Sequence, residues 1–119
     1  MIKISGLNKY YGSLQVLKDV ELSISSQEIV TLLGASGAGK TTLLNIIGTL
    51  DKADSGKVEI NGRDISELNE KQLSEFRNKE IGFVYQFHYL LNEFTALENI
   101  IMPALIAKEK RSIAIEKAK

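Results

Sequence analysis

The chain has 119 residues, which is enough for one domain at most. Its 15 lysines and arginines are balanced by 15 acidic residues, so it lacks the basic excess that attracts nucleic acid, and no nucleic-acid partner is expected. Cysteine is absent and His88 is the only histidine, which excludes disulfides, thiolate metal sites and histidine clusters. The longest apolar run, residues 100–107, is too short to span a bilayer, and the chain itself is expected to be soluble.

Alternating strand and helix patterns in the first half of the chain indicate an α/β fold. Short strands are predicted over Ile2–Leu7 and Leu17–Ile24, where apolar and polar residues alternate. Glu28–Leu33 contains the continuous run IVTLL, which is typical of a strand covered on both faces. Apolar residues then recur through 43–50 at the i, i+3, i+4, i+7 spacing of a buried helix.

The second half continues the alternation. KVEINGRDI predicts a strand that ends in the tight turn Asn61-Gly62. A helix capped at Asn69 should end near Glu80, and Ile81–Tyr85 is predicted to be a second buried strand. An aromatic-rich loop over 86–94 follows. A further helix begins at a capping box, Thr95-x-x-Glu98, and is expected to kink at Pro103, and 111–119 starts another helix.

The stretch GASGAGKTT, residues 34–42, satisfies the pattern G-x-x-x-x-G-K-[ST] between a predicted strand and a predicted helix. Glycines let the backbone curl, so that N–H groups from Gly37 to Thr42 can point at phosphate oxygens. Lys40 can reach the β and γ phosphates, and the Thr41 hydroxyl suits Mg²⁺. A chance glycine-rich turn that only starts a helix is the alternative, but the flanking elements favour nucleotide-phosphate binding.

With these residues in place, the chain resembles the ATP-binding subunits of ABC transporters along nearly its whole length. Tyr11-Gly12 matches the family's aromatic A-loop, and Gln86 in IGFVYQ matches its Q-loop. The stretch RNKEIGFVYQFHYLLNEFTALENIIMPALI is similar to the lipoprotein-releasing subfamily, with macrolide-exporter and cell-division relatives close behind. Gln27 replaces the usual glycine before the acidic residue, a minor departure.

The resemblance implies ATP and Mg²⁺ as cofactors and gives residues for each role. It implies that Tyr11 stacks on adenine, that Gln86 acts in catalysis beside the attacking water, and that Thr41 and Gln86 contact the metal. The nucleotide-binding residues are expected to be Tyr11, Val16, Gly34, Ser36, Gly37, Ala38, Gly39, Lys40, Thr41 and Thr42. Tyr10 is a weaker candidate for stacking than Tyr11.

The implied fold is a P-loop NTPase core joined to a small antiparallel β subdomain, truncated before the family's signature and Walker B segments. Neither an LSGGQ-like signature nor an Asp-Glu pair after an apolar strand nor a switch histidine occurs. Residues 1–119 are thus interpreted as the N-terminal part of a nucleotide-binding domain, divided into a β subdomain (1–27 and 57–63), a P-loop core (28–56 and 64–86) and the start of a helical subdomain (87–119).

The resemblance also implies transmembrane permease subunits and a second copy of the ATP-binding subunit as partners, at the cytoplasmic, inner face of the cell membrane. Two classes of function stay open: part of an ATPase subunit that powers a permease, or a nucleotide-binding or interaction module that does not hydrolyse ATP. A small P-loop kinase or GTPase is disfavoured, because arginines are few and the base-reading Asn-Lys-x-Asp is missing.

Several of these residues also have a simpler structural interpretation. Tyr10 and Tyr11 could cover the edge of a small sheet, and Gln86 could cap backbone groups in a loop. The aromatic residues of 87–94 could pack a core or form a docking surface for a membrane-subunit helix. His88 is not expected to act as a base, because no acidic residue is paired with it in the pattern.

Overall fold

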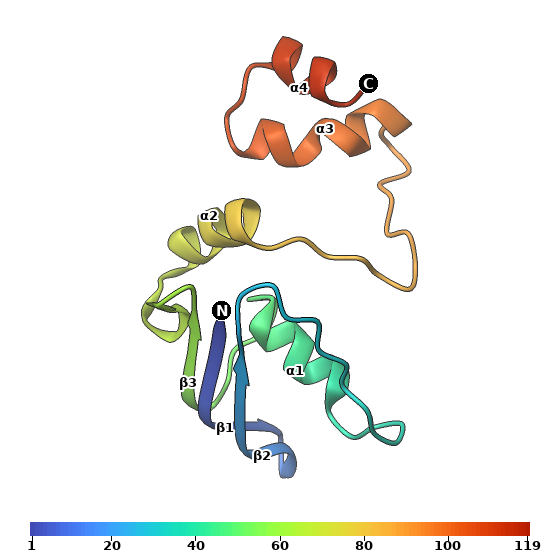
Figure 1. Cartoon of the computed structure of the whole chain (residues 1–119). Helices are drawn as coiled ribbons and strands as arrows, with labels where there is room; N and C mark the ends of the chain where they lie inside the picture. The colour runs from blue at the N-terminus through green and yellow to red at the C-terminus, as the bar shows by residue number, and fades with distance from the viewer. The chain divides into compact units, whose positions relative to one another are not determined.

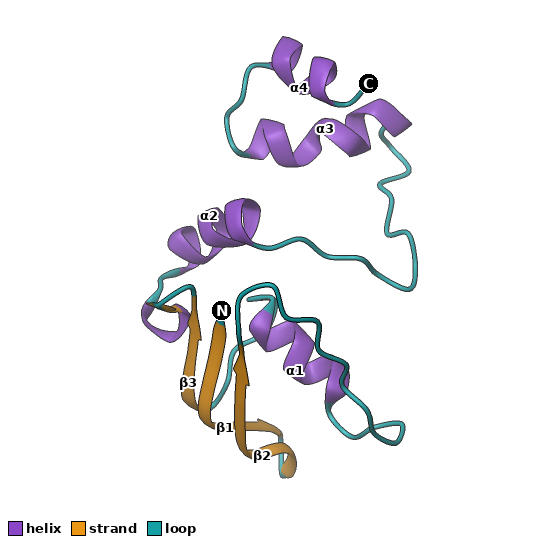
Figure 2. Cartoon of the chain, viewed as in Figure 1, coloured by secondary structure: helices purple, strands orange, loops and turns teal.

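The computed structural model describes all residues from Met1 to Lys119. The chain divides into two compact units, Met1–Leu73 and Ser74–Lys119. Figure 1 shows the course of the chain and Figure 2 its secondary structure. No helix combines the length and the apolar character that crossing a membrane requires.

The first unit is built on a four-stranded antiparallel sheet with the strand order β2-β1-β3-β4. Ile2 of the central strand pairs with Ile24 on one side and with Ile60 on the other. The predicted turn Asn61-Gly62 is confirmed, since both residues have the positive φ angles, 51° and 77°, of a tight hairpin. The strands are β1 (Ile2–Tyr11), β2 (Leu14–Ile24), β3 (Ser55–Ile60) and β4 (Arg63–Asp64).

The core of this unit lies between the sheet and helix α1 (Lys40–Ile47), which contacts β2. A 3-10 helix, η1 (Ile65–Glu67), follows β4 and is capped by the Asp64 carboxylate, which accepts a hydrogen bond from the Ser66 N–H at 2.9 Å. The apolar side chains that share this core come from every element of the unit except β4: Ile4, Leu7, Leu17, Leu43, Ile46, Val58, Ile60, Ile65 and Leu73.

The two predicted buried strands of a P-loop core are not formed, and this part of the fold prediction was wrong. Residues 28–33 and 81–85 have no regular secondary structure (Figure 2), and Ile29 and Val84 are 96% and 100% exposed. A strand needs a hydrogen-bonded neighbour, and the four strands of the sheet pair only among themselves. The apolar pattern therefore indicates a tendency to form strands, but no other strand of this chain pairs with these two segments.

The predicted starts of α2 and α3 were confirmed, because each of these two helices carries its own side-chain cap. Helix α2 (Glu70–Glu80) begins where the Asn69 and Gln72 side chains each accept a hydrogen bond from the other's backbone N–H at 3.0 Å. It ends at Glu80 as predicted. The second unit also contains α3 (Ala96–Ile106) and α4 (Arg111–Lys117), which pack against each other. Helix α3 continues through Pro103.

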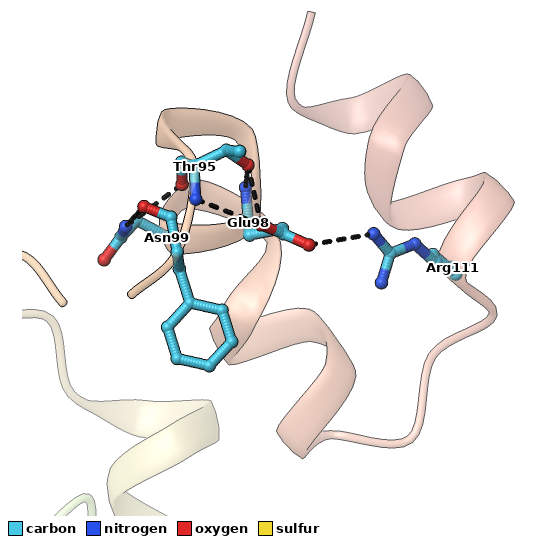
Figure 3. Close-up of polar contacts among 5 residues, drawn as sticks. Thr95, Glu98, Asn99 and Arg111 are labelled. Atoms are coloured by element: carbon cyan, nitrogen blue, oxygen red, sulfur yellow. Dashed lines mark hydrogen bonds and ion pairs between the residues drawn. The ribbon is translucent and has the colours of Figure 1, made fainter. Parts of the chain in front are cut away.

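The start of α3 is fixed by the predicted capping box (Figure 3). The Glu98 carboxylate accepts hydrogen bonds from the Thr95 backbone N–H at 3.0 Å and hydroxyl at 2.8 Å, and it lies 3.4 Å from the Arg111 guanidinium. The Thr95 backbone hydrogen bond, then the Thr95 hydroxyl and Arg111, lower the pKa of Glu98. Asn99 donates to the carbonyls of Leu91 and Phe94, so the preceding loop is tied to the helix.

The exposed apolar residues predict that the isolated chain is marginally stable or aggregates. Ile29, Leu33, Val84 and several residues of the loop after it are exposed, which is unusual for so many large side chains. Circular dichroism during heating, repeated at several protein concentrations, should show a broad or concentration-dependent transition. A cooperative transition that is independent of concentration would contradict this expectation.

A pair of matched substitutions separates aggregation from loss of folding. Val84→Lys adds charge at a fully exposed position and is expected to reduce aggregation without loss of helix content. Ile101→Lys places the same charge where the side chain is 1% exposed and is expected to unfold the second unit.

Candidate functional site

The glycine-rich segment 34–42 forms a curled loop that leads into α1. Gly37 and Gly39 have φ angles of 78° and 83°, in the left-handed region that favours glycine. The Ala38 N–H donates to the Ala35 carbonyl at 3.2 Å, which closes the turn between them. The loop is exposed except at its last glycine, so its backbone is open to a ligand.

Gly39 joins this loop to the sheet by close contact. A Cβ at this position would lie 2.9 Å from the Leu17 Cδ2 and 3.0 Å from the Val16 carbonyl oxygen. Gly39 is also the N-cap of α1 and offers no side chain to cap it. The Leu43 N–H is the first to find an acceptor, the Gly39 carbonyl, at 2.9 Å. The amides of Lys40, Thr41 and Thr42 precede it and lack intrahelical partners, which is the arrangement that binds anions.

The Lys40 side chain folds back over the loop. Its Nζ donates to the carbonyl oxygens of Gly34 at 2.7 Å and Ala35 at 2.6 Å. The Lys40 Cδ and the Ala38 Cβ would each lie within 4 Å of a Cβ at Gly34, so the loop is also narrow at its start. The ammonium group, the free amides and the bare glycine backbone together fit a polyphosphate.

A metal ion at this loop would depend on the phosphates for most of its ligands. The chain contains no group of three or more histidine, cysteine or acidic side chains that could hold an ion by itself. Thr41 is exposed at the start of α1, where its hydroxyl could supply one hard oxygen ligand. This fits Mg²⁺, which binds through few protein ligands together with substrate phosphates.

Tyr11, the predicted adenine-stacking residue, lies at the end of β1 in a polar cluster. Its hydroxyl donates to the Asp51 Oδ2 at 2.6 Å, and its ring, half exposed, has the Lys9 Nζ 5.0 Å from its centroid. Lys9 is 8% exposed and binds the Asp51 Oδ1 at 2.8 Å and the Lys52 carbonyl at 2.6 Å. Tyr10 instead donates its backbone N–H to Asp54.

The charges of this cluster stabilise each other. The hydrogen bond to Asp51 raises the pKa of Lys9 above its ordinary value, although partial burial opposes the shift. Burial raises the pKa of Asp51, but hydrogen bonds from Lys9, Tyr11 and the Lys52 backbone outweigh it, and the net pKa is lowered. Both groups are therefore charged at neutral pH.

The Lys9–Asp51 pair should make stability fall in acid. Because the folded-state pKa of Asp51 lies below its unfolded value of about 3.9, its contribution is present above that value and is lost as the pH falls through the folded-state pKa. The contribution of Lys9 is lost only as the pH rises through its raised pKa.

Urea unfolding of the wild-type chain and of Asp51→Asn measures this effect. We expect the variant to be less stable at about pH 6, and the difference in free energy of unfolding to shrink below about pH 4. A difference that stays constant over this range would show that Asp51 does not stabilise the fold through its charge.

The remaining predicted residues lie in two places. Val16 lies against Gly39 at the start of α1, and its nucleotide-binding role stays a prediction. Gln86 belongs to the second unit and is exposed on its irregular loop, where neighbouring rings contact one another: Phe83 and Tyr85 stack with centroids 5.2 Å apart. Its predicted catalytic and metal roles stay predictions. The exposure of Phe87 and Tyr89 argues against their packing a core.

Sequence reasoning missed Lys9 and Asp51. Lys9 follows Leu7 at an alternate position of a strand, on the face that is otherwise apolar, and a lysine there requires a partner. That pattern could have identified Lys9. Asp51 lies 42 residues away along the chain, and no spacing rule points to it.

Comparison with known proteins identifies the family. Residues 17–119 match the family model described as ABC transporter. The chain belongs to the ABC transporter family of ATP-binding proteins. The resemblance inferred from the phosphate loop and from Gln86 is thus confirmed.

Several curated relatives of this ABC transporter protein carry one name. The chain is 58% identical to the lipoprotein-releasing system ATP-binding protein LolD of Bacteroides thetaiotaomicron, over 99% of this chain and 54% of the relative. It is 54% identical to the protein of that name from Porphyromonas gingivalis, over 96% of this chain and 52% of the relative. The chain therefore spans about half the length of the curated relatives it matches.

The backbone of the chain is also similar to that of a solved ABC transporter cassette. The dimeric structure of MJ0796, a bacterial ABC transporter cassette, matches with a TM-score of 0.88 and 38% identity, over 98% of this chain and 53% of that one. A second structure of that cassette, in a post-hydrolysis state bound to ADP and Pi, matches with a TM-score of 0.87 and 37% identity, over 99% of this chain and 54% of that one. The fold is thus that of part of an ABC cassette, with an antiparallel sheet and helices.

Proposed function

We propose that the chain is the part of an ABC transporter ATPase subunit that binds MgATP and thereby powers a membrane permease, as in lipoprotein release or export. The observation that carries the proposal is the loop at Gly34–Lys40. Its left-handed glycines, its free amides and the Lys40 ammonium converge on one open backbone surface. The lipoprotein-releasing names of its relatives support the transport role.

In this proposal each part of the loop meets a different part of the nucleotide. The amides from Gly37 to Thr42 and the positive end of α1 bind phosphate oxygens. Lys40 exchanges its two carbonyl partners for the β and γ phosphates. Mg²⁺, when bound, would neutralise charge on the phosphates, and the Thr41 hydroxyl would supply one protein ligand. The metal role of Gln86, which belongs to the second unit, rests on the family resemblance alone. Gln86 orients the attacking water, and Tyr11 stacks on the adenine.

The partners are proposed to be a second copy of the subunit and transmembrane permease subunits. Dimeric structures of the related cassette support the first. The exposed rings of Phe87 and Tyr89 support a docking surface for a permease helix, since amphipathic helices bind in such aromatic surfaces. We propose the cytoplasmic face of the cell membrane as the location of the protein.

The alternative is a nucleotide-binding or interaction module that does not hydrolyse ATP. The two functions share the binding step and differ in turnover.

Titration with MgATP followed by phosphate-release assays tests both. Saturable binding of MgATP, with turnover that rises on addition of reconstituted permease, supports the ATPase function. Binding without turnover supports the alternative. If MgATP does not bind at all, the phosphate loop is not a nucleotide site and both fail.

A further inference from the structure

We propose that Asp51 and Lys9 are positioning residues that hold the ring of Tyr11 in the orientation on which the nucleotide base stacks. The inference rests on the proposed nucleotide function. It adds the polar cluster around Tyr11 to the phosphate loop as a second part of the site. It follows from four contacts within the first unit, two made by Tyr11 and two by Lys9.

The ring of Tyr11 is fixed at two points. At its tip the hydroxyl is bound to the Asp51 Oδ2 at 2.6 Å, and over one face the Lys9 ammonium lies 5.0 Å from the centroid. A surface tyrosine without such contacts samples several rotamers, and ordering it on binding reduces affinity. Here the ring is half exposed yet already ordered, which suits a stacking platform.

The two positioning residues are themselves held. Lys9 is almost fully buried and binds both the Asp51 Oδ1 and the Lys52 carbonyl. The Lys52 N–H donates to the same Asp51 Oδ1 at 2.7 Å. The ion pair is partly buried, with the Lys9 and Asp51 side chains 10% and 27% exposed, and its additional hydrogen bonds make it costlier to break than a fully exposed pair. The tyrosine is thus bound to a carboxylate that is itself held by two other groups.

The pairing of β1 with β2 links Tyr11 to the phosphate loop. Tyr11 pairs with Leu14 in the sheet, and Val16, two residues further along β2, contacts Gly39 at the start of α1. Two residues of strand correspond to about 7 Å, so the backbone partner of Tyr11 lies close to the residue that contacts the loop. A ligand that carries both an aromatic base and a polyphosphate could therefore bind both places at once.

The test compares two ligands that share phosphates and differ in the base: MgATP and magnesium tripolyphosphate. Both are titrated by competition against a fluorescent ATP analogue, on the wild-type protein and on three variants. Asp51→Ala removes the support and Tyr11→Phe removes the hydroxyl but keeps the ring. Asp54→Ala is the matched control, since it removes a nearby carboxylate that binds the Tyr10 backbone and not the Tyr11 phenol.

We expect Asp51→Ala and Tyr11→Phe each to weaken MgATP binding about three- to tenfold, as ordering one side chain requires, and to leave tripolyphosphate binding unchanged. The double variant Asp51→Ala/Tyr11→Phe should lose no more MgATP affinity than either single variant, because both substitutions break the same hydrogen bond. Asp54→Ala should change neither ligand. If Asp51→Ala fails to fold, Tyr11→Phe alone decides, because Phe preserves the ring and its packing.

Three results would overturn the inference. Equal loss of both ligands in the variants would mean a structural role only, and unchanged MgATP binding would mean that the ring needs no support. Loss of MgATP binding in Asp54→Ala to the same degree would mean that the whole segment, and not Asp51, matters. A wild-type protein that binds neither ligand contradicts the proposed function itself, which distinguishes that failure from the others.

Discussion

Lys40→Ala is expected to weaken MgATP binding by about a hundredfold or more, the largest loss of any single side chain at the site. The ammonium is the only full positive charge that the structure places on the loop, where it rests on the Gly34 and Ala35 carbonyls. Without it the amides and the positive end of α1 remain, but they carry only partial charges. Equilibrium titration with MgATP measures the loss.

Two further variants make this result specific. Gln86→Ala removes an uncharged side chain and should weaken binding far less, while its effect should fall on turnover. Lys3→Ala removes a charge from an exposed position of β1, remote from the loop in the sequence, and should not change binding. Equal losses for Lys40→Ala and Gln86→Ala would overturn the roles assigned to them.

Gly56→Ala is expected to destabilise the first unit by about 3 kcal/mol or more. Gly56 is the second residue of β3 and has a φ of 97°, and a Cβ there would lie 2.4 Å from the Gly6 carbonyl oxygen and 2.6 Å from the Leu7 Cα. These are backbone atoms of the central strand, so neither side chain rotation nor a small shift relieves the contact. For a domain of this size, such a loss is a large part of the total stability.

The matched control is Gly62→Ala. Gly62 has a similar φ of 77°, but a Cβ there meets nothing within 4 Å. It should therefore cost only the backbone strain, about 1–2 kcal/mol. Urea unfolding followed by circular dichroism compares the two variants. Similar midpoints would show that strand contact at Gly56 contributes little beyond its backbone angle.

Features encoded within a few residues were predictable from the sequence. The capping pairs Asn69–Gln72 and Thr95–Glu98 lie three residues apart, and both helices begin where these pairs indicate. The pattern of the phosphate loop is equally local, because its positive-φ glycines and the start of α1 lie within residues 34–42.

Features that depend on distant partners were not predictable. The run at residues 28–33 has the composition of a buried strand, but composition cannot show whether a neighbouring strand exists, and here the segment stays unpaired. The contact between Tyr11 and Asp51 spans 40 residues and arises from the way β1 and the segment after α1 meet in the fold. The sequence thus predicted the phosphate end of the proposed nucleotide site, whereas it did not predict the residues that we propose to support its base end.

The two carbonyl oxygens that bind the Lys40 ammonium compete with any ligand that enters the loop. An incoming group must compete with both of them for the ammonium, and a neutral or weakly charged oxygen gains nothing by the exchange. A polyphosphate gains, because several charged oxygens replace two dipoles while the amides bind the rest. Any ligand that draws the ammonium away must therefore replace two carbonyl hydrogen bonds at once.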